Sequence, residues 1–203
     1  MKQLRTLLRI ESNPQYADYD VSSNEEIPCA RVRMPQFFGA RRRMPARYSH
    51  FSLMSRVTIE NGVLAQAAEC AAVFRTTRRH SLPYLPDLHS EDEDVRFLAD
   101  RVFAADTVLV ALNEARKVVG FIAFGEGWVN HLYVAPGWQG HGVGRELLKR
   151  AKLQFRSLQL WTFERNAGAL RFYERQGFRV VKRTDGSGNE EKEPDVLLRW
   201  EGC

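Results

Sequence analysis

The sequence predicts one α/β (α+β) domain that starts near residue 55. Apolar residues make up 44% of the chain and charged residues 27%, a balance typical of globular proteins. From residue 55 onward, short runs of β-branched and aromatic residues alternate with longer runs of helical apolar spacing. A few helices together with six or seven strands favour a single domain in which helices cover a sheet.

Seven segments have the pattern of β-strands. The first, RVTIE, ends at Asn61-Gly62, a pair that favours a break in the strand. TVLVALN and KVVGFIAFG are separated only by a short polar turn, which favours a hairpin. The polar run DGSGNEEKEPD indicates a loop before the last strand. The expected strands are 56–60, 107–113, 117–125, 128–134, 157–163, 178–183 and 196–200.

Four segments have the pattern of helices. The first is rich in alanine, the residue with the highest helix propensity. Ser90 precedes the second and is followed three residues later by Glu93, the signature of a capping box. Two prolines between these helices, in SLPYLPDLH, indicate a loop. The expected helices are 64–79, 91–103, 141–155 and 166–176.

Residues 1–54 are predicted to be a basic, poorly ordered extension. The first 55 residues hold nine Lys and Arg against five Asp and Glu, so they carry +4 of the net charge of +5. One interpretation of this segment is an arm, centred on Arg41, Arg42 and Arg43, that binds nucleic acid or a membrane surface. The basic residues lack helical or aromatic-interleaved spacing, so we favour a solvated extension without a nucleic-acid partner. The domain is expected to occupy 55–203.

The composition also indicates the cellular compartment of the protein. No apolar run approaches the length needed to cross a bilayer, and the N-terminus lacks the pattern of a secretory signal. The three cysteines are far apart and odd in number, which fits a reducing cytoplasm better than a disulfide framework. We therefore expect a cytoplasmic protein without a membrane partner. His80 and His89 belong to no cluster with metal-ligand spacing, so no metal site is expected.

The stretch QGHGVG, residues 139–144, stands between a strand pattern and a helix pattern. The first N–H groups of a helix have no partner within the helix, and the helix dipole adds partial positive charge there. Glycines allow unusual backbone dihedrals and leave room for a close ligand. The stretch is therefore suited to bind a phosphate or pyrophosphate.

The spacing of this stretch reduces the number of candidate ligand classes. The third glycine is out of register for a dinucleotide fingerprint, and no Gly-Lys-Ser/Thr triplet of a P-loop is present. The spacing Q-x-x-G-x-G, formed by Gln139, Gly142 and Gly144, resembles the pyrophosphate-binding motif of the GCN5-related N-acetyltransferase (GNAT) superfamily. A later block, NAGALRFYERQGF at 166–178, also resembles that superfamily. The matching residues of this block are Asn166, Ala169, Phe172, Tyr173, Gly177 and Phe178.

The resemblance covers roughly residues 56–200 and is strongest at 117–180. It implies a mixed, twisted sheet of about seven strands and acetyl-CoA as co-substrate. It also implies that strands 128–134 and 157–163 diverge to admit the pantetheine arm, whose amides pair with strand backbone. The cofactor-binding residues implied are Leu132, Tyr133, Val134, Gln139, Gly140, His141, Gly142, Val143, Gly144 and Asn166.

The resemblance implies that Tyr173 is the general acid that protonates the leaving CoA thiolate. A phenol pKa near 10 is close enough to that of an alkyl thiol for transfer. The alternative is that Tyr173 only packs beside Phe172. Asn166 is expected to cap its helix, and in this superfamily it also reaches the pantetheine.

The sequence leaves three options for the general base. Glu126 and His131 are candidates, and a chain of waters without a single base is a third option. Glu126 could equally be a solvated turn residue between two glycines. A strand N–H between Leu132 and Val134 is expected to stabilise the oxyanion.

We therefore expect an N-acetyltransferase in which a primary amine directly attacks acetyl-CoA. The acceptor, a small-molecule or peptide amine, is expected to meet the loop at 80–89 and the helix after it. A non-catalytic acetyl-CoA-binding sensor or regulatory module is the alternative, and the presence of both Tyr173 and Asn166 argues against it. The acceptor's identity stays open. The oligomeric state also stays open, and a homodimer is one option because relatives are often homodimers.

Overall fold

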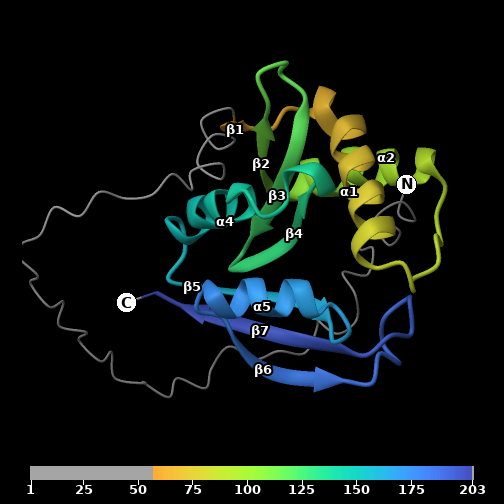
Figure 1. Cartoon of the computed structure of the whole chain (residues 1–203), viewed down its shortest axis with the longest axis vertical. Helices are drawn as coiled ribbons and strands as arrows, with labels where there is room; N and C mark the ends of the chain where they lie inside the picture. Colours follow the sequence, from red (N-terminus) through yellow and green to blue (C-terminus); the bar gives the residue numbers. More distant parts are fainter. Residues whose placement is uncertain (1–56, 203) are drawn as a thin grey trace, which may run out of the picture.

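The computed structural model describes residues 57–202. The predicted extension at residues 1–54 lies outside the described residues. The chain forms a seven-stranded sheet in the order β1-β2-β3-β4-β5-β7-β6 (Figure 1). The strands are β1 (Thr58–Asn61), β2 (Thr107–Leu112), β3 (Val118–Gly125), β4 (Trp128–Val134), β5 (Ser157–Phe163), β6 (Arg179–Thr184) and β7 (Asp195–Glu201).

Among the strands of the described residues, β4 and β5 are parallel neighbours, and every other neighbouring pair is antiparallel. The sheet is therefore mixed, and it has helices on both faces, as predicted for the fold class. The helices are α1 (Ala67–Ser81), α2 (Glu91–Phe97), α3 (Phe103–Ala105), α4 (Val143–Lys152) and α5 (Ala167–Arg175). Two 3-10 helices, η3 (Leu64–Gln66) and η5 (Pro136–Trp138), and one π-helix, η4 (Leu98–Val102), complete the described elements.

The core has two layers, one on each face of the sheet. Strand side chains alternate between the faces. Thus Leu109 and Ala111 of β2 lie in the layer that contains α4 and α5, whereas Val108 and Val110 lie in the layer that contains α1 and η4. The helices pack against the centre of the sheet. The edge strand β6 is exposed along nearly its whole length.

The helix starts predicted at Ser90 and Asn166 are confirmed, because both residues form capping hydrogen bonds. Ser90 accepts a hydrogen bond from the Glu93 N–H at 3.3 Å and donates its own N–H to the Glu93 carboxylate at 2.7 Å. Asn166 caps α5 by accepting from the N–H of Ala169 at 3.1 Å. The helix predicted at 141–155 is shorter, because Gly142 has φ 88° and α4 therefore begins at Val143.

Candidate functional site

A large cleft opens where β4 and β5 separate. Its volume is about 1250 Å³, and residues of α1, β4, the glycine turn, α4 and α5 line it. Such a volume exceeds the usual range for small-molecule pockets, roughly 300–1,000 Å³. The cleft is therefore large enough for an extended ligand.

The expected divergence of β4 from β5 is present. The two strands share one pair, Trp128 with Gln159, and the N–H of Gln159 donates to the carbonyl of Gly127 at 2.8 Å. Among the described residues, no further pair joins these strands. Beyond Trp128, β4 therefore has a partner only on its β3 side.

The β4 backbone exposes hydrogen-bonding groups in this gap. The N–H of Ala135 donates to Val119 at 2.9 Å, so Ala135 faces β3. Bonded and non-bonded pairs alternate in an antiparallel ladder, which turns the backbone groups of Leu132 and Val134 away from β3. The carbonyl of Val134 accordingly accepts from the side chains of Thr77 at 3.1 Å and Gln139 at 3.0 Å. The backbone of Leu132 and the N–H of Val134 remain available to a ligand.

The glycine turn ends at the first turn of α4. Gly140 and Gly142 have φ of 75° and 88°, a left-handed conformation that side chains rarely adopt. The first helical hydrogen bond runs from the N–H of Glu146 to the carbonyl of Gly142 at 3.0 Å. The N–H groups of residues 143–145 precede it, so they point out of the helix end. This is the geometry of an anion-binding helix terminus.

The cleft brings together most of the predicted binding residues. Those that line it are Leu132, Tyr133, Val134, Gln139, Gly140, His141, Gly142, Gly144 and Asn166. Val143 instead has its side chain in the core, with 1% exposed, so only its backbone can serve a ligand. The charged side chains that line the cleft are four arginines, and no Asp or Glu is among them. The described part of the cleft wall is therefore cationic.

Tyr173 lines the cleft from α5 and is 7% exposed. Its ring lies edge-on to Phe172 and Phe178, at 5.1 and 5.5 Å between centroids. Burial raises the pKa of Tyr173 well above its usual value near 10, so the phenol keeps its proton at any physiological pH. Burial would raise the pKa of a thiol in the same cleft as well, which preserves the match between donor and acceptor.

Tyr133 brings a second phenol to the cleft, which sequence analysis did not consider as an acid. Burial raises the pKa of Tyr133, and the positive charge of nearby Arg78 opposes this rise. Tyr133 is half-buried against Phe74 of α1, with centroids 4.9 Å apart. Strand alternation could have indicated that its side chain lies on the α1 face, but nothing local in the sequence indicates the contact with Arg78.

Glu126 does not line the cleft. It occupies the turn between β3 and β4, with φ 51° beside Gly127 at φ 82°, and its side chain is exposed. Its carboxylate lies near Asp106, whose pKa is raised by burial and further by the charge of Glu126. The structure thus places this candidate base at the hairpin, at the opposite end of β4 from the glycine turn.

His131 lies in an aromatic cluster. Its ring is stacked with Tyr133 at 6.2 Å and edge-on to Phe97 of α2 at 5.7 Å. Burial lowers the pKa of His131 from 6.5 to about 4. The imidazole is therefore neutral at physiological pH, and it is a weak base.

The lowered pKa of His131 predicts an acid-sensitive contribution to stability. The folded state favours the neutral ring, so this contribution is complete above pH 6.5 and is lost as the pH falls through 4. It amounts to at most about 3 kcal/mol, since one pKa unit corresponds to about 1.4 kcal/mol. His131→Phe is expected to remove it. Urea unfolding of both proteins between pH 7 and pH 4 should show the variant losing less stability. Parallel pH profiles would contradict the burial of His131.

Two loops meet beside the cleft. The Arg78 guanidinium pairs with Glu191 at 3.0 Å, and His89 lies 3.2 Å from Glu190, so the β6–β7 loop is joined to α1 and to the α1–α2 loop. Arg165 pairs with Glu193 at 3.1 Å, and its guanidinium lies 3.9 Å from the centre of the Tyr84 ring. Sequence analysis expected the acceptor near 80–89 and did not consider the β6–β7 loop, because its contacts with Arg78 and His89 span more than a hundred residues.

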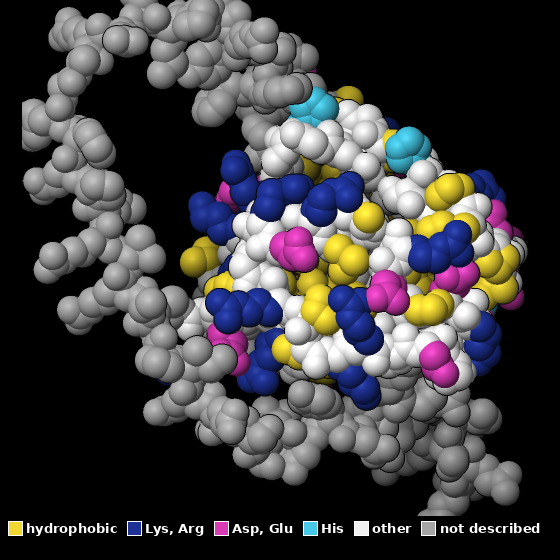
Figure 2. Space-filling model, turned by 60° about the horizontal axis from the view of Figure 1, so that its bottom comes forward, with side chains coloured by type: hydrophobic (Ala, Val, Ile, Leu, Met, Phe, Trp, Pro, Cys, Tyr) yellow, Lys and Arg dark blue, Asp and Glu magenta, His cyan; other side chains and the backbone are white. Residues whose placement is uncertain are grey.

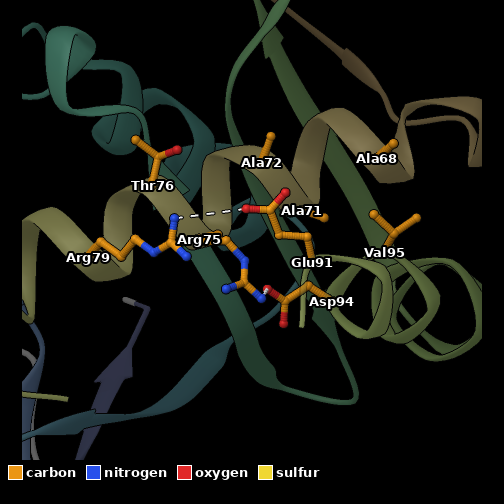
Figure 3. A pocket seen from close by; sticks show the side chains of 9 residues that line it. All are labelled: Ala68, Ala71, Ala72, Arg75, Thr76, Arg79, Glu91, Asp94 and Val95. Atoms are coloured by element: carbon orange, nitrogen blue, oxygen red, sulfur yellow. Dashed lines mark ion pairs between the residues drawn. The ribbon is translucent and has the colours of Figure 1, made fainter. Parts of the chain in front are cut away.

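A second, smaller cavity of about 190 Å³ lies between α1 and α2 (Figure 3). Arg75 and Asp94 form a buried pair there, with 2.6 Å between nitrogen and oxygen. Arg75 also donates to the carbonyl of His89 at 2.7 Å. Arg79 and Glu91 pair more loosely across the same cavity, at 3.9 Å. The residues that line the cavity therefore form an ion-pair network, and this network holds α2 against α1.

Asp94→Asn is expected to destabilise the domain by about 3 kcal/mol, because it leaves the buried charge of Arg75 without its main partner. Glu91→Gln is the matched control. Its carboxylate is 75% exposed, so the expected loss is below about 1 kcal/mol. Urea unfolding at neutral pH measures both. Equal losses would show that the Arg75–Asp94 pair does not fasten α2.

Comparisons with known proteins agree with the fold. Residues 104–180 match the family model of the acetyltransferase (GNAT) domain. The chain is 34% identical over 94 residues to the peptidyl-lysine N-acetyltransferase YjaB of Escherichia coli, covering 46% of this chain and 64% of that protein. It is 29% identical over 89 residues to the peptidyl-lysine N-acetyltransferase YiaC of the same organism, covering 43% and 59%. The chain thus spans about three fifths of the length of these relatives.

Solved structures show the same fold. The solution structure of apo YjaB matches with a TM-score of 0.62 and 24% identity, over 72% of this chain and 99% of that one. The structure of yncA from Salmonella typhimurium with acetyl-CoA matches with a TM-score of 0.56 and 22% identity, over 71% and 93%. The chain therefore contains a match to the acetyltransferase (GNAT) domain over residues 104–180, and its fold is the one that these solved structures share.

Across residues 57–202, no three His, Cys, Asp or Glu side chains come together so that they could hold a metal ion. Within the same range, no helix has both the length and the apolar character that crossing a membrane requires.

Proposed function

We propose that this protein is an N-acetyltransferase that uses acetyl-CoA and acetylates a primary amine. The observation that carries the proposal is the open edge of β4 beside the glycine turn of α4. An open strand edge and an anion-binding helix terminus in one cleft suit a ligand with both amides and a pyrophosphate. Acetyl-CoA has both groups.

The residues present fit acetyl-CoA. Its pyrophosphate would lie on the N–H groups of the turn from Gln139 to Gly144, where the glycines, which lack side chains, leave room. Its pantetheine arm would pair with the backbone of Leu132 and Val134 and reach Asn166. When bound, acetyl-CoA supplies an activated thioester. A strand N–H in this region would then stabilise negative charge on the carbonyl oxygen.

Tyr173 would hold the proton that the departing thiolate takes up. Its burial in the cleft and its raised pKa keep it protonated until that step. For the base, the geometry favours a chain of waters. Glu126 does not line the cleft, and the imidazole of His131 is a weak base in its apolar surroundings.

The acceptor we propose is the side-chain amine of a lysine in a peptide or protein. The β6–β7 loop beside the cleft carries the exposed carboxylate of Glu190, which attracts a cationic chain. YjaB and YiaC are named peptidyl-lysine N-acetyltransferases, and this supports the same acceptor class here.

Mass spectrometry of lysine-containing peptides incubated with the protein and acetyl-CoA tests the proposal. Acetylation of a lysine amine, above the rate without protein, is the expected result. Acetylation confined to peptide N-termini or to small amines would overturn the acceptor class. Binding of acetyl-CoA without transfer to any amine would instead support the sensor alternative.

A further inference from the structure

We infer that basic side chains at the end of α4 and along the adjoining end of the sheet form a surface that binds the phosphate backbone of a nucleic-acid duplex. This surface, called the basic end below, consists of Lys149, Arg150, Arg156, Arg179 and Arg199. None of the five lines the large cleft, so the basic end is separate from the co-substrate site and does not depend on the proposed function.

Contacts bring the end of α4 next to the end of β7. The Lys152 ammonium, in the last turn of α4, lies 4.5 Å from the centre of the Trp200 ring on β7. The N–H of Gly202 donates to the carbonyl of Arg156 at 2.7 Å. The last turn of α4 and the start of β5 therefore lie beside the end of β7, at the left of Figure 1.

The start of β6 adds a guanidinium group to the same end. Arg179 begins β6 and is the direct partner of Arg199 across the ladder to β7. Like charges that face each other on neighbouring strands repel. Arg199 pairs with Glu201 at 3.2 Å, whereas Arg179 has no carboxylate within 4 Å among residues 57–202. An anion bound between the two arginines would relieve this repulsion.

The protein neutralises only part of the charge of the basic end. Glu201 pairs with Arg199, and Glu146 lies 3.9 and 3.7 Å from the two basic side chains of α4. The C-terminal ends of α4 and α5 add about −0.5 each through their dipoles. With Lys152 included, six cations face two carboxylates and two helix ends, which leaves an excess of about +3. Figure 2 shows Lys and Arg side chains along the left side of the face that it presents.

The side chains present favour a phosphate backbone over a bilayer. Four of the five residues are arginines, and a guanidinium group binds phosphate with two parallel hydrogen bonds. Attachment to a membrane surface requires a broad apolar face as well as charge. α4 instead buries its apolar side chains in the core, and Leu153, at 74% exposure, follows the helix as an isolated apolar side chain. A duplex needs no such face, because phosphate contacts supply nearly all of non-specific binding.

Sequence spacing could not reveal this surface, because its residues come from α4, the turn before β5, β6 and β7. Sequence analysis argued against a nucleic-acid partner only from the basic residues at 1–54, which lie outside the described residues. The basic end is a property of the folded domain.

Fluorescence anisotropy of a labelled DNA duplex of about 20 base pairs, titrated with the full chain at several salt concentrations, tests the inference. We expect roughly micromolar binding at low salt that weakens steeply as salt rises, since each neutralised phosphate adds about 0.9 to the slope of log affinity against log salt. In the variant carrying Arg156→Gln and Arg179→Gln, this slope should fall by about 2 and the low-salt affinity by about tenfold. Both side chains are exposed, so the variant is expected to fold normally.

The variant carrying Arg96→Gln and Lys117→Gln is the matched control. It removes the same charge from exposed positions on α2 and before β3, and we expect it to lose less than about twofold in affinity. Acetyl-CoA affinity should be unchanged in both double variants. A loss of acetyl-CoA affinity confined to the Arg156/Arg179 variant would show that the basic end belongs to the co-substrate site, and would overturn the inference.

The remaining outcomes are equally decisive. Failure of the folded wild-type protein to bind the duplex at low salt would overturn the inference and leave the proposed function intact. An unchanged slope in the Arg156/Arg179 variant would overturn it too, and a loss on replacing Arg41, Arg42 and Arg43 by Gln would then assign the binding to the N-terminal segment. Binding to vesicles that contain phosphatidylserine, without binding to the duplex, would replace the nucleic acid by a membrane.

Discussion

Gly142→Glu is expected to abolish acetyl-CoA binding, with an increase in Kd of at least about 100-fold, or roughly 2.7 kcal/mol. Two causes act together. Gly142 has φ 88°, which strains any other side chain, and it lies at the N-terminus of α4 on the wall of the cleft. A carboxylate there would also repel the pyrophosphate that the exposed N–H groups attract. Calorimetry, with circular dichroism to confirm folding, measures the effect.

Gly137→Glu is the matched control for this substitution. Gly137 lies in the same connection between β4 and α4, but it does not line the cleft, and a Cβ there meets no atom within 4 Å. This variant adds the same side chain and charge, and we expect nearly unchanged binding. Equal losses in both variants would point to a general charge effect, and normal binding by folded Gly142→Glu would refute the anion site.

Tyr173→Phe is expected to lower kcat by roughly 100-fold to 10,000-fold, the usual contribution of a general acid. The Kd for acetyl-CoA should change little. The ring packs against Phe172 and Phe178, and phenylalanine retains that packing. Steady-state rates with a lysine peptide, measured together with calorimetric affinities, separate the two quantities.

Tyr133→Phe tests the rival phenol of the cleft, and Tyr84→Phe controls for loss of a hydroxyl elsewhere. Tyr84 does not line the cleft, although Arg165 stacks on its ring. A loss of kcat confined to Tyr173→Phe would support its role as the acid. If Tyr133→Phe lost the activity and Tyr173→Phe kept it, the proton would come from the Tyr133 hydroxyl.

The sequence predicted the elements of this fold well, because they depend on local patterns. Alternation in TVLVAL places Val108 and Leu109 on opposite faces, and the capping residues Ser90 and Asn166 start their helices. The glycines of the QGHGVG stretch were expected to allow unusual backbone dihedrals, and Gly140 and Gly142 both have positive φ. The divergence of β4 and β5 was different. Only the resemblance to the GNAT superfamily suggested it, because strand order is a long-range property.

The electrostatics of the site could not be predicted in this way. Whether an arginine is paired depends on loops distant in sequence, as the contact of Arg78 with Glu191 shows. The lowered pKa of His131 follows from rings on α1 and α2 that surround it. Glu126 looked equally suitable as a base or a turn residue until its position relative to the cleft was known. Burial and pairing, rather than residue type, separate these roles.

The central claim is that the cleft between β4 and α5 binds acetyl-CoA. Calorimetric titration of acetyl-CoA into the purified wild-type protein, with NAD as a second pyrophosphate-containing ligand, tests it most directly. The account predicts saturable binding of one acetyl-CoA per chain and much weaker binding of NAD, which lacks the pantetheine arm. Absence of acetyl-CoA binding in a folded sample, or equal binding of NAD, would contradict it.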